Sequence, residues 1–242
     1  MKRIVDLILS IVGLIVASPI LLPAMIAVYW QDWHSPFYIA PRMGRGERPF
    51  RMVKLRSMKI NADKSGVDST GAADPRITAV GRFVRRYKLD EVTQLWNVLL
   101  GDMSLVGPRP NVERETRLYT PTEKRLLSVK PGITDIASIV FADEGDILKD
   151  KPDPDLAYNQ LIRPWKSRLG LFYIDNRSTL MDLKLVWLTI IAILSRANAL
   201  AGVHRMLVRQ KAPEDLARIV LRQEALVPRA PPGQDEIVTS RG

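Results

Sequence analysis

Two adjacent carboxylates, Asp90 and Glu91, directly follow a short basic segment, residues 85–88. A carboxylate held among cations can attack a phosphorus atom while its neighbour holds a divalent metal ion. The same two acids can instead cap and balance a helix, because carboxylates are favoured in the first helical turn. The residues of this segment, taken alone, leave both interpretations open.

Helical spacing places the two carboxylates at the start of a helix. Apolar side chains recur at positions 89, 92, 95, 96, 99 and 100, and Gly101 stands where this helix should end. Farther on, Pro108 and Pro110 fix the backbone on both sides of Arg109. Such a rigid segment can present a guanidinium to a phosphate, or it can form a plain surface turn.

The composition of the chain narrows the kinds of site that it can build. Its 242 residues are enough for one domain with appendages, and its 36 Lys and Arg against 26 Asp and Glu give a net charge of +10. This charge favours anionic partners: nucleic acid, acidic lipid headgroups or phosphate-bearing substrates. The chain has no Cys and two His. Disulfides and thiolate sites are therefore excluded, and any bound metal should be a hard cation with oxygen ligands.

An uncharged apolar segment, residues 7–30, predicts contact with a membrane. As a straight helix it would rise about 36 Å, enough to cross a hydrocarbon core of roughly 30 Å. Pro19 predicts a kink or break in this helix, and the hydroxyl of Ser18 could satisfy a carbonyl freed there. Basic residues flank the segment on both sides, and such flanks prefer the cytoplasmic side. These features favour a re-entrant helix hairpin over residues 1–36, with a single span as the alternative.

The pattern after this segment predicts an α+β fold, mostly helical, with residues 37–202 as its main domain. The domain should begin with a hairpin over residues 37–55, followed by a mobile loop over the site at 59–76. A helix is predicted over residues 113–129. The acidic stretch 143–154 matches no calcium-loop pattern and is interpreted as a solvated connector.

Two further segments are predicted near the C-terminus. The apolar stretch 180–194 is too short to span and favours a helix that lies in the membrane interface, with a buried core helix as the alternative. Residues 203–242 predict a short amphipathic helix followed, from residue 227, by a Pro-rich disordered tail.

Six short stretches together carry a family resemblance: residues 2–19, 54–58, 85–97, 101–110, 130–134 and 180–184. The first contains the apolar run interrupted at Ser18 and Pro19, and the third contains the pair Asp90-Glu91. In their order and spacing these stretches resemble the bacterial sugar transferase family. These are small monotopic phosphoglycosyl transferases, which begin the assembly of exopolysaccharides, O-antigens or glycoconjugates on a polyprenol phosphate.

The resemblance implies an enzyme at the cytoplasmic face of the bacterial inner membrane, with residues 37–202 as its catalytic domain. It implies a Mg²⁺-dependent site in which Asp90 carries a covalent phosphosugar and Glu91 holds the metal. The substrates would be a UDP-sugar and undecaprenyl phosphate, with UMP released, membrane lipid as a further partner and a homodimer as a candidate assembly. The expected phosphate ligands are all basic: Lys54, Arg56, Arg85 and Arg109. Asp182 is a further candidate for the site.

The sequence departs from the family pattern at residues 135–138, which read Asp-Ile-Ala-Ser where many members carry Gly-Trp-Ala-Gln. The identity of the sugar and of the glycan pathway is therefore not carried over. Two other function classes remain open. One is a membrane-bound glycosyltransferase that releases UDP.

The other is a basic, membrane-anchored binding protein for nucleic acid or acidic lipid. This class explains the net charge but not the acids among the arginines, which weaken anion binding. It also lacks the aromatic residues expected of a base-stacking surface, so no nucleic-acid partner is predicted.

Overall fold

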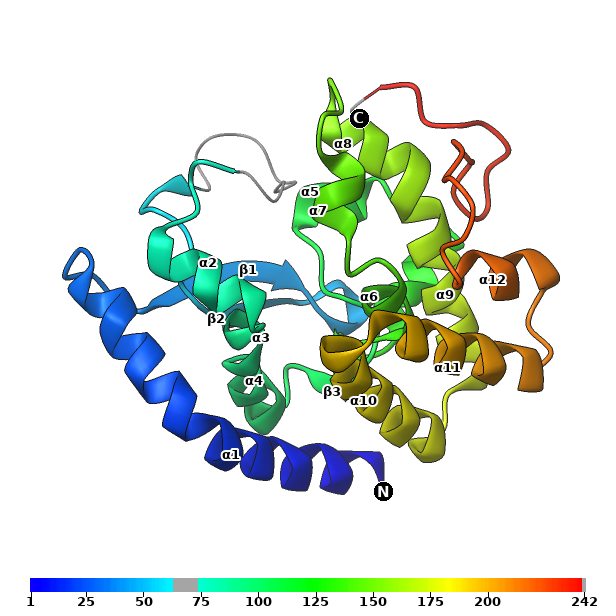
Figure 1. The fold of residues 1–242 in the computed structure, drawn as a ribbon. Helices are drawn as coiled ribbons and strands as arrows, with labels where there is room; N and C mark the ends of the chain where they lie inside the picture. The colour runs from blue at the N-terminus through cyan, green and yellow to red at the C-terminus, as the bar shows by residue number, and fades with distance from the viewer. Residues whose placement is uncertain (63–73, 241–242) are drawn as a thin grey trace.

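The computed structural model describes residues 1–62 and 74–240 and has the mostly helical α+β fold that the sequence predicts (Figure 1). The strands are β1 (Phe37–Met43), β2 (Pro49–Leu55), β3 (Ser104–Val106) and β4 (Gly132–Thr134). The helices of the first half are α1 (Lys2–Trp30), α2 (Ala79–Arg86), α3 (Leu89–Val92), α4 (Leu95–Leu100) and α5 (Glu113–Arg117). The predicted loop at residues 59–76 lies largely outside the described residues.

The second half of the chain is helical. Its helices are α6 (Ile136–Val140), α7 (Glu144–Leu148), α8 (Pro154–Ala157), α9 (Arg163–Asn176), α10 (Thr179–Leu194), α11 (Arg196–Arg209) and α12 (Glu214–Ile219). Shorter 3₁₀ and π segments are η1 (Arg45–Glu47), η3 (Glu123–Ser128) and η4 (Tyr158–Ile162). The main hydrophobic core lies between α6, α9, α10 and α11, and a smaller one lies between α1, α2 and α3.

The N-terminal helix α1 runs without interruption through Pro19 and Pro23. Pro19 has no N–H to give to the carbonyl of Ile15, and the Ser18 hydroxyl donates to that carbonyl instead, at 2.7 Å. The predicted role of Ser18 is thus confirmed. Helix α1 curves along the edge of the molecule (Figure 1). The segment predicted as a hairpin is one curved helix, and its re-entrant course in a membrane stays a prediction.

The start of α1 is fastened to the domain by charged side chains. Lys2 Nζ donates to Asp182 Oδ2 at 2.6 Å. The Asp6 carboxylate is buried and accepts a hydrogen bond from the Ser104 hydroxyl at 2.8 Å. Arg3 donates to carbonyls at the C-terminal end of α4, where helix carbonyls lack partners of their own. The first turn of α1 therefore belongs structurally to the domain.

The other end of α1 packs on the same domain. Its buried residues Leu21, Ala24 and Val28 form the smaller core together with residues of β2, α2 and α3. Just beyond the helix, the Arg56 guanidinium forks onto the carboxylate of Asp32. Both ends of the apolar helix are therefore held by a single domain.

The hairpin of β1 and β2 confirms the sequence prediction, and it positions the helix that carries the carboxylate pair. The two strands pair antiparallel along their whole length. The outer edge of β2 is taken up by Asn97 of α4, which donates to the Arg51 carbonyl at 2.8 Å and accepts from the Val53 amide at 2.9 Å. Asn97 is completely buried. This side chain therefore ties α4 to the strand that carries Lys54.

The helix predicted over residues 89–100 is divided into α3 and α4. The Thr93 hydroxyl donates to the Asp90 carbonyl at 3.1 Å and to the Val53 carbonyl at 3.3 Å. These contacts hold a tight turn between the two helices and press α3 against β2. Gly101, with a φ of +94°, ends α4 as predicted.

The segment that carries Arg109 is positioned by a close approach of two glycines. β3 and β4 pair in parallel, which brings Gly107 against Gly132. A Cβ at Gly132 would lie 2.1 Å from the Gly107 nitrogen, so no larger residue fits without moving the backbone. The loop that presents Arg109 is therefore fixed by tertiary packing as well as by its two prolines.

Two further predicted elements differ from the structure. The prediction of one helix over residues 113–129 is wrong, because α5 ends at Arg117 and a separate 3₁₀ segment, η3, follows. Thr120 lies just before this second segment and is bonded to its first residue: its hydroxyl accepts from the Glu123 amide at 3.1 Å, and Glu123 Oε2 accepts from the Thr120 amide at 3.0 Å. Pro121 follows Thr120 directly, and it cannot continue a helix from α5.

The disordered tail is the second difference. The described part of the tail, residues 227–240, is bonded to α9 and η4, and in Figure 1 it runs along the α9 side of the molecule. The Arg229 guanidinium lies over the Trp165 ring, 4.5 Å from the ring centroid, and the Arg229 backbone amide donates to the Gln160 carbonyl at 3.0 Å. Gln160 Nε2 donates to the Val238 carbonyl at 2.7 Å. The prediction of disorder is wrong because these long-range contacts have no local signature in a polar, Pro-rich sequence.

Candidate active site

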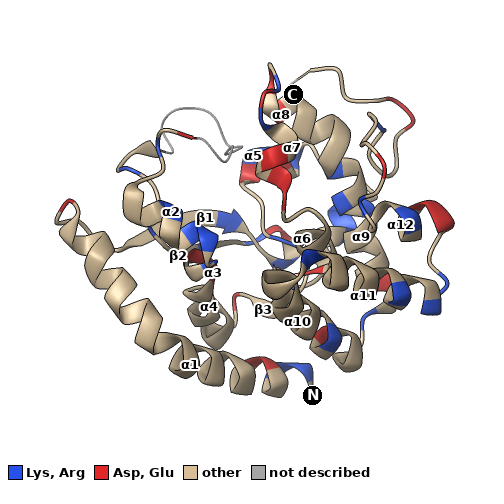
Figure 2. Cartoon of the chain, in the orientation of Figure 1, with Lys and Arg blue, Asp and Glu red and all other residues tan. Residues whose placement is uncertain are grey.

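A cavity of about 620 Å³ opens between α2 and α3 on one side and α6 and the C-terminal end of α10 on the other. Its volume is typical of a small-molecule site. The cavity brings together five of the residues predicted from the sequence: Lys54, Arg85, Asp90, Glu91 and Arg109. Acidic α3 and basic α2 adjoin each other there (Figure 2). The predicted site is thus assembled from β2, α2, α3 and the loop after β3.

Asp90 presents an unpaired oxygen at this site. Its Oδ1 is buried and has no hydrogen-bond partner among the described residues. Burial raises the pKa of Asp90, and the adjacent Glu91 charge raises it further. The nearby cations Lys54, Arg109 and Arg85 offset this rise only in part. A buried carboxylate oxygen with no partner of its own is available to a ligand or to a phosphorus atom.

Glu91 is held ionised by its neighbours. Arg109 Nη2 donates to Glu91 Oε1 at 2.9 Å. Burial raises the pKa of Glu91, but the charges of Arg109 and of two lysines outweigh it and bring the pKa to about 2. The two adjacent acids therefore have opposite shifts, which is the usual sign of two different roles in one site.

Lys54 and Arg85 hold the basic side of the site. Arg85 Nε donates to the Ser57 hydroxyl at 3.0 Å. Gly81 lets α2 approach this point, because a Cβ there would lie 1.9 Å from the Ser57 carbonyl oxygen. Burial, followed by the charge of Arg109, lowers the pKa of Lys54 to about 8. Both side chains therefore carry a positive charge into the cavity near neutral pH.

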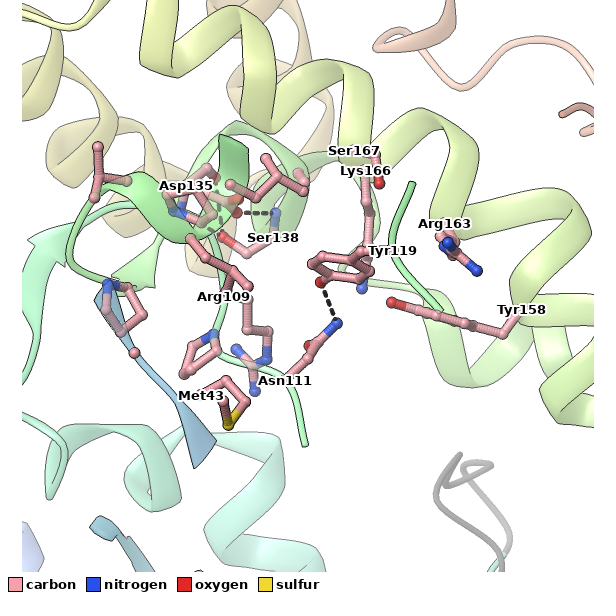
Figure 3. Close-up of a pocket in the computed structure, with 18 residues that line it drawn as sticks. Met43, Arg109, Asn111, Tyr119, Asp135, Ser138, Tyr158, Arg163, Lys166 and Ser167 are labelled. Atoms are coloured by element: carbon pink, nitrogen blue, oxygen red, sulfur yellow. Dashed lines mark hydrogen bonds between the residues drawn. The ribbon is translucent and has the colours of Figure 1, made fainter. Parts of the chain in front are cut away.

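A smaller pocket adjoins the cavity beside Arg109 (Figure 3). Asn111 Nδ2 donates to the Tyr119 hydroxyl at 2.9 Å. The hydroxyl of Tyr158 points toward the same pair (Figure 3). Lys166 lines both hollows and forms an ion pair with Glu144. These polar groups extend the charged site away from Asp90, and the sequence alone did not single them out.

The residues that depart from the family pattern have a structural role. Asp135 and Ser138 form a capping box at the start of α6: the Ser138 amide donates to Asp135 Oδ1 at 2.6 Å, and the Asp135 amide donates to the Ser138 hydroxyl at 2.8 Å. Ser138 lines the cavity. The departure therefore changes the cavity wall itself.

Two predicted site residues lie outside the cavity. Asp182 accepts from Lys2 and, at 2.6 Å, from the Tyr173 hydroxyl. Arg56 is buried at the end of α1, where it forks onto Asp32 and donates to the Ser35 carbonyl at 2.9 Å. Both side chains hold α1 to the domain. The structure therefore separates them from the five residues that it brings together.

We expect Arg56→Ala to destabilise the protein without weakening the binding of a phosphate-bearing ligand in the cavity. The change removes a nearly buried guanidinium and leaves Asp32 without its partner. The free energy of unfolding should therefore fall by about 2–3 kcal/mol, a value between those typical of exposed and of fully buried ion pairs. Urea unfolding in detergent measures this loss. Arg125→Ala is the control, because Arg125 pairs with Asp175 in an exposed ion pair. Weaker binding of a phosphate-bearing ligand, with unchanged stability, would show that Arg56 belongs to the site after all.

The shifted pKa values of Asp90 and Lys54 predict a bell-shaped dependence of activity on pH. A nucleophilic role for Asp90 would require its carboxylate to be ionised, and its raised pKa would then move the acid limb of the profile above the usual carboxylate range. Lys54 loses its proton above its pKa of about 8, so kcat/KM for a phosphate-bearing donor should fall as pH rises through that value. Lys54→Arg keeps its charge and should remove the basic limb. An unchanged basic limb in that variant would assign it to another group.

Fold and site together define a class of protein: an α+β domain with an exposed apolar helix and a carboxylate pair among cations. A model of the family described as Bacterial sugar transferase matches residues 1–196. The chain belongs to this family, and the resemblance drawn from its motifs is confirmed.

Three relatives illustrate the match. The chain is 34% identical over 213 residues to the exopolysaccharide production protein ExoY of Sinorhizobium fredii, which covers 81% of this chain and 87% of that protein. It is 33% identical over 209 residues to the galactosyl transferase CpsE of Streptococcus agalactiae, covering 82% and 43%. It is 30% identical over 205 residues to the UDP-glucose:undecaprenyl-phosphate glucose-1-phosphate transferase of Caulobacter vibrioides, covering 82% and 71%.

The chain spans only part of several relatives. It covers 43% of CpsE and 61% of a Bacillus subtilis relative that is 44% identical over 109 residues. Activity, substrates and partners are therefore proposed below on the site as well as on the relatives' names.

Proposed function

We propose that this chain transfers a sugar-1-phosphate from a UDP-sugar to undecaprenyl phosphate and releases UMP, through a covalent intermediate on Asp90. The relative from Caulobacter vibrioides is named for this kind of transfer. The observation that carries the proposal is the buried Oδ1 of Asp90, which has no partner among the described residues and lies in a cavity lined by cations. Such an arrangement suits attack on a phosphate diester or diphosphate, where charge must be offset at every stage.

In the first step a carboxylate oxygen of Asp90 attacks the sugar-side phosphorus of the donor. The bond from this phosphorus to the bridging oxygen of UMP breaks, and UMP leaves with the bonding electrons. Arg85 and Arg109 offset the charge that develops on the phosphate oxygens. Asp90 then carries the phosphosugar as an acyl phosphate.

In the second step a phosphate oxygen of undecaprenyl phosphate attacks the same phosphorus. The bond between phosphorus and the Asp90 oxygen breaks, which restores the carboxylate and yields a diphosphate-linked lipid sugar. The product of the whole cycle is this lipid and UMP. Because donor and acceptor react in separate steps, their phosphates need not occupy the site together, which limits charge repulsion.

The carboxylates of the site fit a magnesium ion held jointly with the substrate. Among the described residues there is no group of three or more potential ligands. Mg²⁺ is commonly bound through one or two carboxylates together with substrate phosphates and water. Glu91, ionised across the physiological range, would hold the ion. When bound, Mg²⁺ neutralises diphosphate charge.

The attachment of α1 supports a helix that enters and leaves the same leaflet. Helix α1 is long and apolar enough to cross a membrane by length and composition. Its first two turns are bonded to Ser104 and Asp182, however, and its end packs on β2 and α2. A helix whose two ends bind one water-exposed domain cannot place them on opposite sides of a bilayer. We therefore propose a monotopic enzyme at the cytoplasmic face of the bacterial inner membrane.

One assay separates the three function classes. The protein is incubated with Mg²⁺, undecaprenyl phosphate and UDP-glucose, UDP-galactose or UDP-N-acetylgalactosamine, and the released nucleotide is identified. UMP is expected. Release of UDP would instead show a glycosyltransferase that breaks the bond between sugar and phosphate. Release of neither nucleotide with any donor would favour a binding protein without catalysis.

A further inference from the structure

The cavity has two chemically different sides. The side that carries Asp90 is charged. The opposite side is mainly apolar: Ile133 of β4, Ile139 of α6, and Ala192 and Ile193 at the end of α10 line it, together with the hydroxyls of Thr134, Ser138 and Thr189. The phosphates and hydroxyls of a soluble nucleotide sugar gain nothing from such a wall. The apolar side is therefore suited to a second ligand with hydrocarbon character.

The apolar wall continues out of the cavity onto the surface of α10. Ile193 lines the cavity and is nevertheless 61% exposed, so it stands at the rim. Beside it, Trp187, Ile190 and Leu194 are also exposed. Residues three, four and seven apart lie on one helix face, so these side chains form a continuous stripe. The stripe runs about 10 Å along the helix axis and ends at the cavity mouth.

The one hydroxyl that α10 contributes to the cavity wall is already satisfied. Thr189 Oγ1 lies 2.6 Å from Thr134 Oγ1 and donates to the Leu185 carbonyl at 2.8 Å. The wall therefore presents hydrocarbon rather than free hydrogen-bonding groups. Across the mouth, Arg86 and Lys88 line the same cavity and are exposed. The mouth is thus apolar on one side and cationic on the other.

We propose that the exposed stripe of α10, formed by Trp187, Ile190, Ile193 and Leu194, binds the isoprenoid chain of the acceptor. This proposal deepens the proposed function and rests on it. The chain lies on the stripe and passes Ile193, and its phosphate reaches the cationic side of the cavity near Asp90. An amphiphile with an anionic head and a long hydrocarbon tail matches both sides of the mouth. The stripe is continuous with the cavity, which favours the isoprenoid chain of the acceptor over ordinary bilayer lipid, because only the acceptor must bring its phosphate into the cavity.

The experiment compares a long acceptor with a short one. Ile193→Ser is assayed with undecaprenyl phosphate and with geranyl phosphate, using the donor that gives UMP with the unaltered protein. The matched control is Ile15→Ser on α1, since Ile15 is 66% exposed and lies outside the cavity. We expect the ratio of kcat/KM for the long acceptor to that for the short one to fall about tenfold in Ile193→Ser and to stay unchanged in Ile15→Ser.

Two results would overturn the proposal. If Ile193→Ser and Ile15→Ser change the ratio alike, the stripe acts only as a general membrane contact. If Ile193→Ser weakens both acceptors equally, Ile193 shapes the cavity without binding the chain. Exchange of labelled UMP into the UDP-sugar needs no acceptor and reports on the donor half of the site in each variant. Absence of this exchange in the unaltered protein would overturn the covalent function itself, which is a separate and recognisable outcome.

Discussion

Replacing Asp90 by Asn should lower the rate of UMP release by roughly 10⁴-fold or more, the scale of effect seen when a nucleophile is removed. The amide has nearly the size of the carboxylate but lacks its charge and cannot form an acyl phosphate. The fold should survive, because Asp90 Oδ1 has no hydrogen bond to lose among the described residues. Two measurements apply: the rate of UMP release, and the mass of the protein after incubation with donor alone.

The control for this variant is Asp175→Asn. Asp175 is exposed on α9, pairs with Arg125 and lies outside the cavity. The substitution makes the same chemical change outside the site, so the activity of the Asp175→Asn variant should equal that of the unaltered protein. Retained turnover in Asp90→Asn, or an adduct mass still present on that variant, would rule out Asp90 as the residue that carries the phosphosugar.

The second large effect is expected from Glu91→Gln, read as a dependence on Mg²⁺. Glutamine can still accept the hydrogen bond from Arg109, but it removes the negative charge that a divalent ion needs. The Mg²⁺ concentration for half-maximal rate should rise about 10- to 100-fold. Chelation with EDTA should stop UMP release by the unaltered protein, and added Mg²⁺ should restore it.

Glu113→Gln serves as the control for the metal titration. Glu113 pairs with Arg117 on the exposed face of α5, and it is not among the residues that line the cavity. Its Mg²⁺ dependence should match that of the unaltered protein. If Glu91→Gln needs no more Mg²⁺ than the unaltered protein while its rate falls, Glu91 serves to orient Arg109 and the ion is held elsewhere.

The opposite pKa shifts of the two acids explain why adjacent residues can have different tasks. Glu91 is paired with Arg109, and its charge is fixed there. Asp90 is half-buried beside that charge, and its buried Oδ1 has no partner among the described residues, so Asp90 is the more basic of the two. A more basic carboxylate is the better nucleophile, and a firmly ionised one is the better cation ligand.

Residue types and local spacing were enough to find most of the site. The helical pattern, the pair Asp90-Glu91 and the rigid prolines around Arg109 are all short-range features, and the structure brings these residues into one cavity. The hairpin of β1 and β2 and the end of α4 at Gly101 followed from equally local signals. Ser18 was found in the same way, because the carbonyl freed by Pro19 is one turn away.

Arg56 and Asp182 show where local patterns fail. Both sit in motifs that resemble those of the family, and both are charged, so the sequence placed Arg56 among the phosphate ligands and made Asp182 a further candidate for the site. In the structure each is bonded to a distant segment: Arg56 to Asp32, and Asp182 to Lys2 across most of the chain. A motif records that a charge is required at a position but not which group it faces.

The sequence by itself determined the family, the long apolar first helix and the five charged residues of the cavity. Composition and the spacing of residues close together in the chain carry that information. Only the tertiary structure decided which charges meet substrate and which fasten α1, and it alone ordered the tail against α9 and set the apolar end of α10 opposite Asp90. These outcomes depend on burial and on contacts between residues far apart in the chain. Their free energies arise only when the whole core has closed around them.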